Sequence, residues 1–140
     1  MKVKKFSMYT FIWAIGGIAY YAIEILYRGY SHWSMFVVGG TVLTFCTYQG
    51  VEMDWTEPIW IQILRATVFA TSLEFITGII VNKYMALSVW DYSDQPLQLW
   101  GQICIPFMLL FSGLISIAIP IGGVLVHRLF GEKKPNIFIL

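Results

Sequence analysis

Four long apolar runs dominate the sequence and restrict what it can fold into. They cover residues 8–27, 34–50, 58–82 and 101–126. A helix that crosses a bilayer needs about 20 mostly apolar residues, and each run is close to or above that length. A membrane β-barrel would instead show alternating segments of about ten residues. We therefore predict an all-α integral membrane protein, a bundle of four transmembrane helices that forms a single membrane domain over all 140 residues.

The composition excludes most other classes of protein. Hydrophobic residues make up 58% of the chain and charged residues only 12%, whereas an ordinary soluble domain has about 25% charged residues. A soluble domain of this length buries about 70% of its unfolded surface, which is too little to hide so many apolar side chains. The net charge of +1 provides no field for binding nucleic acid. We expect membrane lipids, and no nucleic acid, as its partners.

Basic residues near the ends of the runs predict the orientation. Six lie on the side that holds both termini: Lys2, Lys4, Lys5, Arg128, Lys133 and Lys134. Only Arg28 and Lys83 lie on the other side. Because basic residues concentrate in the cytoplasm, we predict a cell-membrane protein with both termini cytoplasmic. The acidic connection between the second and third runs, with Glu52, Asp54 and Glu57, is either solvated or paired with the basic termini or a basic partner.

Residues near the predicted boundaries are typical of membrane interfaces. Trp33, Trp90 and Trp100 fall at the predicted outer ends, where amphipathic indole rings are preferred. Arg65 lies about 10 Å into the third run from its inner end, so we interpret it as an anchor whose long side chain reaches the inner surface. The first turn of the fourth run, residues 101–106, is either part of that helix or a separate interfacial turn.

Motifs of soluble chemistry are missing from the sequence. Cys46 and Cys104 have neither metal-ligand nor redox spacing, and their predicted depths place them too far apart for a disulfide. The chain contains no Walker A, HExxH or GxSxG pattern, so it does not hydrolyse ATP by itself in the P-loop manner. We predict no cofactor.

Charged residues inside the runs are the strongest functional signal. An ionisable group within a membrane segment costs about 2.5–3.5 kcal/mol on insertion scales. Glu24 and Glu74 lie at similar predicted depths, and Arg28 can neutralise either of them. Glu74 shares one helical stripe with Gly78 and Asn82, a pattern that suits close packing and hydrogen bonds between membrane helices.

Eight polar residues are predicted to gather at the outer end of the bundle: Glu24, Arg28, His32, Glu74, Asn82, Asp91, Ser93 and Gln102. A cluster with both signs of charge suits a zwitterionic or polar ligand, or a lipid head group. The same residues suit a structural network that locks the helices together. Carboxylates and a histidine are also plausible metal ligands, but they have no fixed ligand spacing, so we predict no metal.

Several motifs carry a family resemblance. They are Glu24-x3-Arg28-Gly29-x-Ser31-His32-Trp33-Ser34-Met35, Gly39-Gly40, Glu74-x2-Thr77-Gly78-x3-Asn82, Trp90-Asp91-Tyr92-Ser93-x2-Pro96 and Gly101-Gln102-Ile103-Cys104. Their order, from about Tyr20 to Ser116, resembles the putative ABC-transporter type IV permease family of bacterial membrane proteins and is similar to the vertebrate transmembrane protein 229 group. Gln98 stands where the family favours Asn, and Phe111 where Trp is common. The resemblance implies a multi-pass membrane protein of permease type, without assigned catalytic residues.

Three hypotheses for the function follow. The first is a permease-like transport component with a polar site at the outer end, which would need a separate ATP-binding subunit or a homo-oligomer. The second is an accessory or scaffold membrane protein without a ligand. The third is an intramembrane enzyme acting on a lipid or amphiphile. In that case Glu24 or Glu74 would be the acid or base, His32 and Asp91 would assist, and Arg28 would hold an anionic group.

Overall fold

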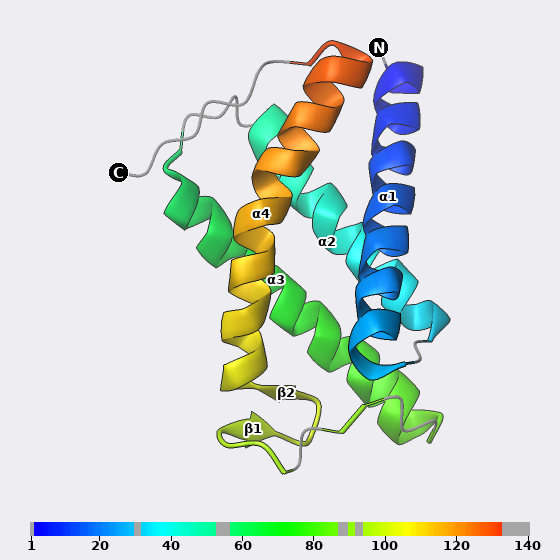
Figure 1. The fold of residues 1–140 in the computed structure, drawn as a ribbon, viewed down its shortest axis with the longest axis vertical. Helices are drawn as coiled ribbons and strands as arrows, with labels where there is room; N and C mark the ends of the chain where they lie inside the picture. Colours follow the sequence, from blue (N-terminus) through cyan, green and yellow to red (C-terminus); the bar gives the residue numbers. More distant parts are fainter. Residues whose placement is uncertain (1, 30–31, 53–56, 87–89, 92–93, 133–140) are drawn as a thin grey trace.

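The structure is a computed structural model that describes residues 2–29, 32–52, 57–86, 90–91 and 94–132. The elements are α1 (Lys2–Arg28), α2 (Trp33–Glu52), α3 (Ile59–Gly78), the π-helix η1 (Ile79–Tyr84), β1 (Gln98–Leu99), β2 (Ile103–Cys104) and α4 (Ile105–Phe130). Of the four long helices in the described part of the chain, α1 and α4 stand upright and α2 and α3 cross the bundle obliquely (Figure 1). Each is long and apolar enough to cross a membrane, with η1 extending α3, which confirms the predicted all-α bundle of four transmembrane helices.

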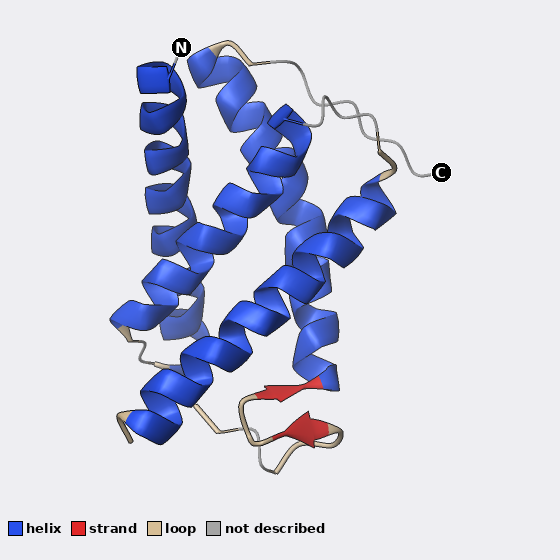
Figure 2. Ribbon diagram, turned by 180° about the vertical axis from the view of Figure 1, so that it is seen from behind, coloured by secondary structure: helices blue, strands red, loops and turns tan. Residues whose placement is uncertain are grey.

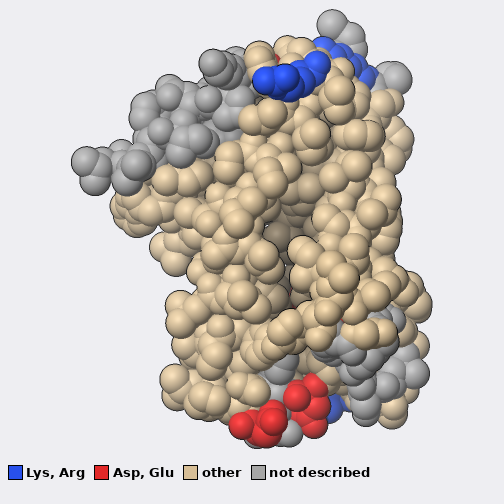
Figure 3. All heavy atoms as spheres, viewed as in Figure 1, with Lys and Arg blue, Asp and Glu red and all other residues tan. Residues whose placement is uncertain are grey.

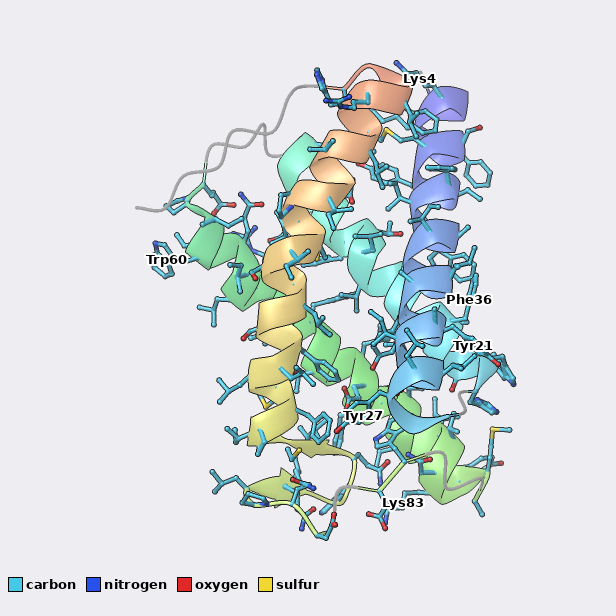
Figure 4. The ribbon with its side chains drawn as sticks, in the orientation of Figure 1. Lys4, Tyr21, Tyr27, Phe36, Trp60 and Lys83 are labelled. Atoms are coloured by element: carbon cyan, nitrogen blue, oxygen red, sulfur yellow. The ribbon has the colours of Figure 1, made fainter. Side chains whose placement is uncertain are left out.

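The two ends of the bundle are easily told apart. One end, here called the terminal end, holds the start of α1 and the end of α4, whereas β1 and β2 mark the opposite, hairpin end (Figures 1 and 2). Lys4 lies at the terminal end and Lys83 at the hairpin end (Figure 4). The first and last helices therefore begin and end on the same side, as an even number of spans requires.

The fourth helix begins later than the predicted run. It starts at Ile105, because the segment from residue 98 to 104 folds back as a short antiparallel hairpin. Trp100 and Gly101 have positive φ angles of 55° and 72°, and Cys104 is extended, so none of the three continues a helix. The helix then starts with Pro106 in its first turn, where the missing N–H costs no hydrogen bond. Of the two alternatives for this segment, the structure shows the separate turn for residues 101–104, and the helix begins at Ile105.

The helix α2 occupies the centre of the bundle. In the most apolar 18-residue stretch of α2, 61% of the residues are buried. The corresponding share is 17% for α1 and 28% each for α3 and α4. It contacts all three other helices, and α1 packs mainly on α2. α3 runs on a slant across the bundle (Figure 2), and with η1 it continues for 26 residues, from Ile59 to Tyr84, whereas α2 has 20.

Glycines bring α1 and α2 into close contact. A Cβ built on Gly16 would lie 2.8 Å from the carbonyl oxygen of Gly39, and one on Gly17 would lie 2.6 Å from the ring of Phe36. A Cβ on Gly40 would overlap the carbonyl oxygen of Trp13. The two backbones therefore touch directly, as small residues allow between membrane helices.

Three apolar clusters fill the interior of the bundle. One joins α2, α3 and α4 around Cys46, a second joins α1, α2 and α4 around Ile12 near the terminal end, and a third surrounds Trp90 near the hairpin end. Cys46 and Cys104 are both buried and free, as expected. At the hairpin end, Trp33 and Trp100 expose about two thirds of their surfaces, which agrees with their predicted interfacial positions.

Candidate functional site: a lateral cavity

Described residues from all four helices line a cavity of about 240 Å³. This volume lies between that of an engineered cavity that holds benzene, about 150 Å³, and the range of about 300–1,000 Å³ for sites of drug-sized ligands. The lining is apolar except for two side chains, the Glu74 carboxylate and the Tyr20 hydroxyl. A single carboxylate on an otherwise apolar wall within the membrane is the most distinctive chemical feature of the described structure.

The cavity opens between α1 and α4 toward the lipid. Ile23 of α1 and Ile117 and Ile121 of α4 line it, and each exposes 43–58% of its surface. The space-filling view shows a hollow at mid-height between these two helices (Figure 3). The cavity is therefore accessible from the side of the bundle, through the bilayer, rather than through an axial pore.

Aromatic pairs join α1 to α4 near this opening. Tyr20 and Phe111, which both line the cavity, meet edge to face with their ring centroids 6.5 Å apart. Closer to the terminal end, Phe11 and Phe130 lie 5.8 Å apart. Because α1 and α4 otherwise have few contacts, these pairs define the edges of the two helices that face each other.

Glu74 reaches the cavity from the predicted polar stripe of α3. Its side chain is only 5% exposed, and Ala70, one turn earlier, lines the same wall. One turn later, a Cβ on Gly78 would lie 3.0 Å from the ring of Trp90 and overlap the Gln102 amide. The stripe therefore faces the interior of the bundle, as its spacing predicted.

Asn82, Trp90 and Gln102 form a hydrogen-bonded network at the hairpin end. The Asn82 amide donates to Gln102 Oε1 at 2.8 Å, and Asn82 Oδ1 accepts from the Trp90 backbone N–H at 3.3 Å. The Trp90 indole donates to the Gln102 carbonyl at 2.9 Å, and Gln102 Nε2 donates to the Trp100 carbonyl at 2.9 Å. The network ties the connection before α4 onto η1.

Trp90 follows η1 at the hairpin end, where its position was predicted, but it points into the bundle rather than toward the membrane interface. Its side chain is only 6% exposed and packs against Met35, Val38 and Val81. An indole N–H needs an acceptor when it is buried, and the Gln102 carbonyl provides one. Trp90 is therefore a core residue.

His32 caps the start of α2. Its Nδ1 accepts a hydrogen bond from the Ser34 backbone N–H at 3.2 Å and lies 2.7 Å from the Ser34 hydroxyl. Its ring also lies against Trp33 at a centroid distance of 5.3 Å. The first turn of a helix has N–H groups without partners in the helix, and His32 satisfies one of them.

The remaining predicted site residues are spread over the hairpin end. Glu24 is half-buried on α1, and Asp91 is exposed beside Trp90. Arg28 ends α1, but its side chain lies outside the described residues, as does all of Ser93. Of the eight predicted site residues, the structure joins Asn82 to Gln102 by a hydrogen bond. It places Glu74 in the lining of the cavity. Within the described part of the chain, no three His, Cys, Asp or Glu residues are grouped to hold a metal ion.

The terminal end has its own ion pairs, which link three helices. Lys5 of α1 lies 3.1 Å from Glu52 at the end of α2 and 3.7 Å from Glu132, just after α4. The Tyr9 hydroxyl also donates to Glu52, at 3.0 Å. Of the alternatives for the acidic connection, the structure shows pairing with the basic N-terminal segment for Glu52, whereas Asp54 lies outside the described residues.

Arg65 is more than a lipid anchor. It donates to both carboxylate oxygens of Glu57 at 2.7 and 2.9 Å and to Gln49 Oε1 at 2.9 Å. Gln49 in turn donates to the Gln62 carbonyl at 3.2 Å. The guanidinium therefore connects α2 to the start of α3. Its hydrogen bonds and charge also hold the pKa of Glu57 below its ordinary value of 4.5.

This lowered pKa makes the Glu57–Arg65 pair sensitive to pH. The pair stabilises the fold above pH 4.5, and its contribution is lost as the pH falls through the lowered pKa of folded Glu57. Because both side chains are about one third exposed, we expect Glu57→Gln to cost below about 1 kcal/mol at pH 7 and to have no effect in strong acid. Thermal unfolding in detergent across pH, with Asp94→Asn as the control, tests this. A cost that does not change with pH contradicts it.

Sequence reasoning missed most of the cavity residues. Ala19, Tyr20 and Leu114 stand in apolar runs where almost every residue is apolar, so nothing sets them apart. Phe111 had one signal, because it replaces a residue that is commonly Trp in the resembling family. Glu74 was found because a carboxylate within a span is costly.

Comparison with known proteins places the whole bundle in one family. The family described as "Putative ABC-transporter type IV" matches residues 5–139, which include all four long helices. No curated protein and no solved structure matches the chain. The chain therefore belongs to this ABC-transporter-type family and is a membrane protein related to transport.

Proposed function

We propose that the chain is a permease-like transport component that receives a molecule from the bilayer in the lateral cavity between α1 and α4. The observation that carries the proposal is the apolar cavity beside Glu74, whose opening faces the lipid. A purely structural bundle gains nothing from such a hollow, because a void deprives its lining of packing contacts. The site in this proposal is thus the cavity itself, and Glu74 is its polar group.

Energy for transport would come from a separate ATP-binding subunit. The chain lacks a Walker A motif, and its family is of the ABC-transporter type. With both termini in the cytoplasm of a cell-membrane protein, as predicted, such a subunit meets the terminal end. There the carboxylates of Glu52 and Glu57 already pair with Lys5 and Arg65, so they leave little for a basic partner.

Exposed basic side chains at the terminal end fit an acidic partner surface instead. Lys4, labelled in Figure 4, and Arg128, in the last turn of α4, are both exposed. Figure 3 shows basic side chains gathered at this end. We expect the tagged protein, purified from its native membranes in mild detergent, to carry an ATP-binding protein identifiable by mass spectrometry. Reversing both charges, Lys4→Glu with Arg128→Glu, should lower the recovered partner about tenfold, equivalent to about 1.4 kcal/mol.

Lys83→Glu is the matched control, because Lys83 is an exposed lysine at the hairpin end. It should leave the recovery of the partner unchanged. Recovery of no ATP-binding protein, or equal recovery with the double variant and the Lys83→Glu control, would exclude the proposed partner arrangement.

The accessory or scaffold hypothesis has one observation in its favour. The Asn82–Trp90–Gln102 network satisfies its own donors and acceptors, as a purely structural lock would. This explains the hairpin end but not the cavity. In the enzyme hypothesis, His32 would have to assist through its Nε2, because its Nδ1 is occupied at the start of α2.

A further inference from the structure

We infer that the lateral cavity holds one hydrocarbon chain, from an amphiphile whose head group donates a hydrogen bond to Glu74. The inference deepens the proposed function, because it names the class of molecule that the same cavity receives. It rests on the shape of the cavity, on the side from which it opens, and on the chemistry of its one carboxylate.

The cavity is long and narrow. On α1 its lining extends from Ile15 to Ile23, which at about 1.5 Å per residue is about 12 Å. On α4 it extends from Phe111 to Ile121, about 15 Å. A volume of about 240 Å³ over that length leaves a channel that suits an extended chain rather than a fused ring system.

The opening makes the bilayer the source of the occupant. Ile23, Ile117 and Ile121 line the cavity and also face outward, so a chain can enter sideways without crossing a polar surface. An empty hollow loses dispersion contacts along its whole lining, and hydrocarbon from the membrane restores them. The narrow lining leaves room for one chain, so the second tail of a two-tailed lipid would remain outside.

Glu74 selects the head group. Of the two α3 residues that line the cavity, Glu74 is one turn nearer the hairpin end than Ala70. The inference takes the Glu74 carboxylate as ionised. In that form it only accepts hydrogen bonds, and it has about four lone-pair sites, so it can accept from the protein and from a ligand together. A hydroxyl or ammonium head gains a charge-assisted hydrogen bond there, whereas a carboxylate or phosphate head is repelled. The chemistry therefore favours an alkyl alcohol or amine over a fatty-acid anion.

Photolabelling of the purified full-length protein in lipid nanodiscs tests the inference. The probe is 1-dodecanol with a diazirine at its methyl end, and labelled peptides are located by mass spectrometry. We expect labels on the cavity-facing residues of α1 and α4. At equal mole fraction in the nanodisc, 1-dodecanol should compete at least about tenfold better than dodecanoate, because one hydrogen bond to a charged group supports such a ratio. Adamantane methanol, a bulky alcohol, should not compete.

Two variants with matched controls locate the site. Ala19 is exposed and lines the cavity, so Ala19→Trp should block the opening and lower the labelling at least about tenfold. Ile18→Trp, on an adjacent exposed position outside the lining, should not. Glu74→Gln should keep the labelling but remove the preference for the alcohol over the carboxylate. If Glu74→Gln does not fold, the competition by adamantane methanol and the comparison of Ala19→Trp with Ile18→Trp still test whether the cavity holds a hydrocarbon chain.

The possible failures are distinct. Labelling that is spread evenly over the lipid-facing residues, or equal competition by the bulky alcohol, overturns the inferred chain site even when an ATP-binding partner is recovered. Conversely, failure to recover any ATP-binding protein with the unaltered chain, while the cavity is still labelled, overturns the transport proposal alone. A two-tailed phospholipid that stays bound in native mass spectrometry and is not displaced by dodecanol excludes a single-tailed amphiphile as the source.

Discussion

Replacing Gly40 by alanine should destabilise the folded protein by about 1–3 kcal/mol, the usual cost of overpacking a well-packed interior. The new Cβ would overlap the carbonyl oxygen of Trp13 and lie 3.1 Å from the Trp13 ring. The overlap is with backbone on α1, so no flexible side chain can move aside. The helices would have to separate along the contact that also involves Gly16. Valine at position 40 should prevent folding altogether.

Thermal unfolding in detergent, followed by size-exclusion chromatography, measures this effect. Gly113→Ala is the matched control, because Gly113 is also in a membrane helix but has no atom within 4 Å of a built Cβ. There the substitution should be neutral or stabilising by up to about 1 kcal/mol, since alanine favours the helix more than glycine does. If both alanines had the same effect, the direct contact between α1 and α2 would not be the cause.

Replacing Gln102 by leucine should cost roughly 1–3 kcal/mol, because it removes two partly buried hydrogen bonds, each of which contributes about 0.5–1.5 kcal/mol. Gln102 is 2% exposed, and its amide joins Asn82 to the Trp100 carbonyl. Leucine has nearly the same size, so the loss comes from the unpaired polar groups. The segment from residue 94 to 104 should also become more sensitive to proteases.

Gln98→Leu is the control, because Gln98 is exposed. Its side-chain Oε1 accepts one hydrogen bond, from the Gly101 backbone N–H at 2.6 Å. The cost of this substitution should stay below about 1 kcal/mol. The double variant Asn82→Ala with Gln102→Leu should lower the free energy of unfolding by less than the sum of the two single variants. The reason is that each substitution alone already removes the hydrogen bond between the two amides. Strict additivity would show that the two amides do not act together.

The apolar runs and the costly carboxylate were predictable, because each depends on one segment at a time. Any helix in a bilayer must be apolar over about 20 residues, and a carboxylate such as Glu74 stands out there. The spacing from Glu74 to Gly78 and Asn82 also predicted the inward face of α3, since helical periodicity requires no knowledge of the neighbours. Charge alone placed Glu52 near basic residues but left open whether it is solvated or paired, and the ion pair with Lys5 decides this.

Features that depend on contacts between distant segments were not predictable. Leu99 pairs with Ile103 and Trp100 has a positive φ, and these two features determine where α4 starts. In the sequence the same stretch belongs to a continuous apolar run. The burial of Trp90 depends on a carbonyl twelve residues away. The cavity arises only where four helices meet imperfectly, and apolar residues that line a hollow look the same in sequence as those that fill a core.

The unequal lengths of the helices relate the cavity to the thickness of the membrane. At about 1.5 Å per residue, the 20 residues of α2 span about 30 Å, which matches the hydrocarbon core of a bilayer, whereas 26 residues of α3 and η1 approach 39 Å. A helix that exceeds the hydrocarbon thickness tilts, and α3 does cross the bundle on a slant (Figure 2). Length alone does not set this slant, because the shorter α2 also slants and α4, which has 26 residues, runs upright (Figure 1). Packing between the helices therefore sets the tilt of α3 and places Glu74 on its inward face. We expect a change in bilayer thickness to act on the long α3 more than on α2, and so to alter the space beside Glu74.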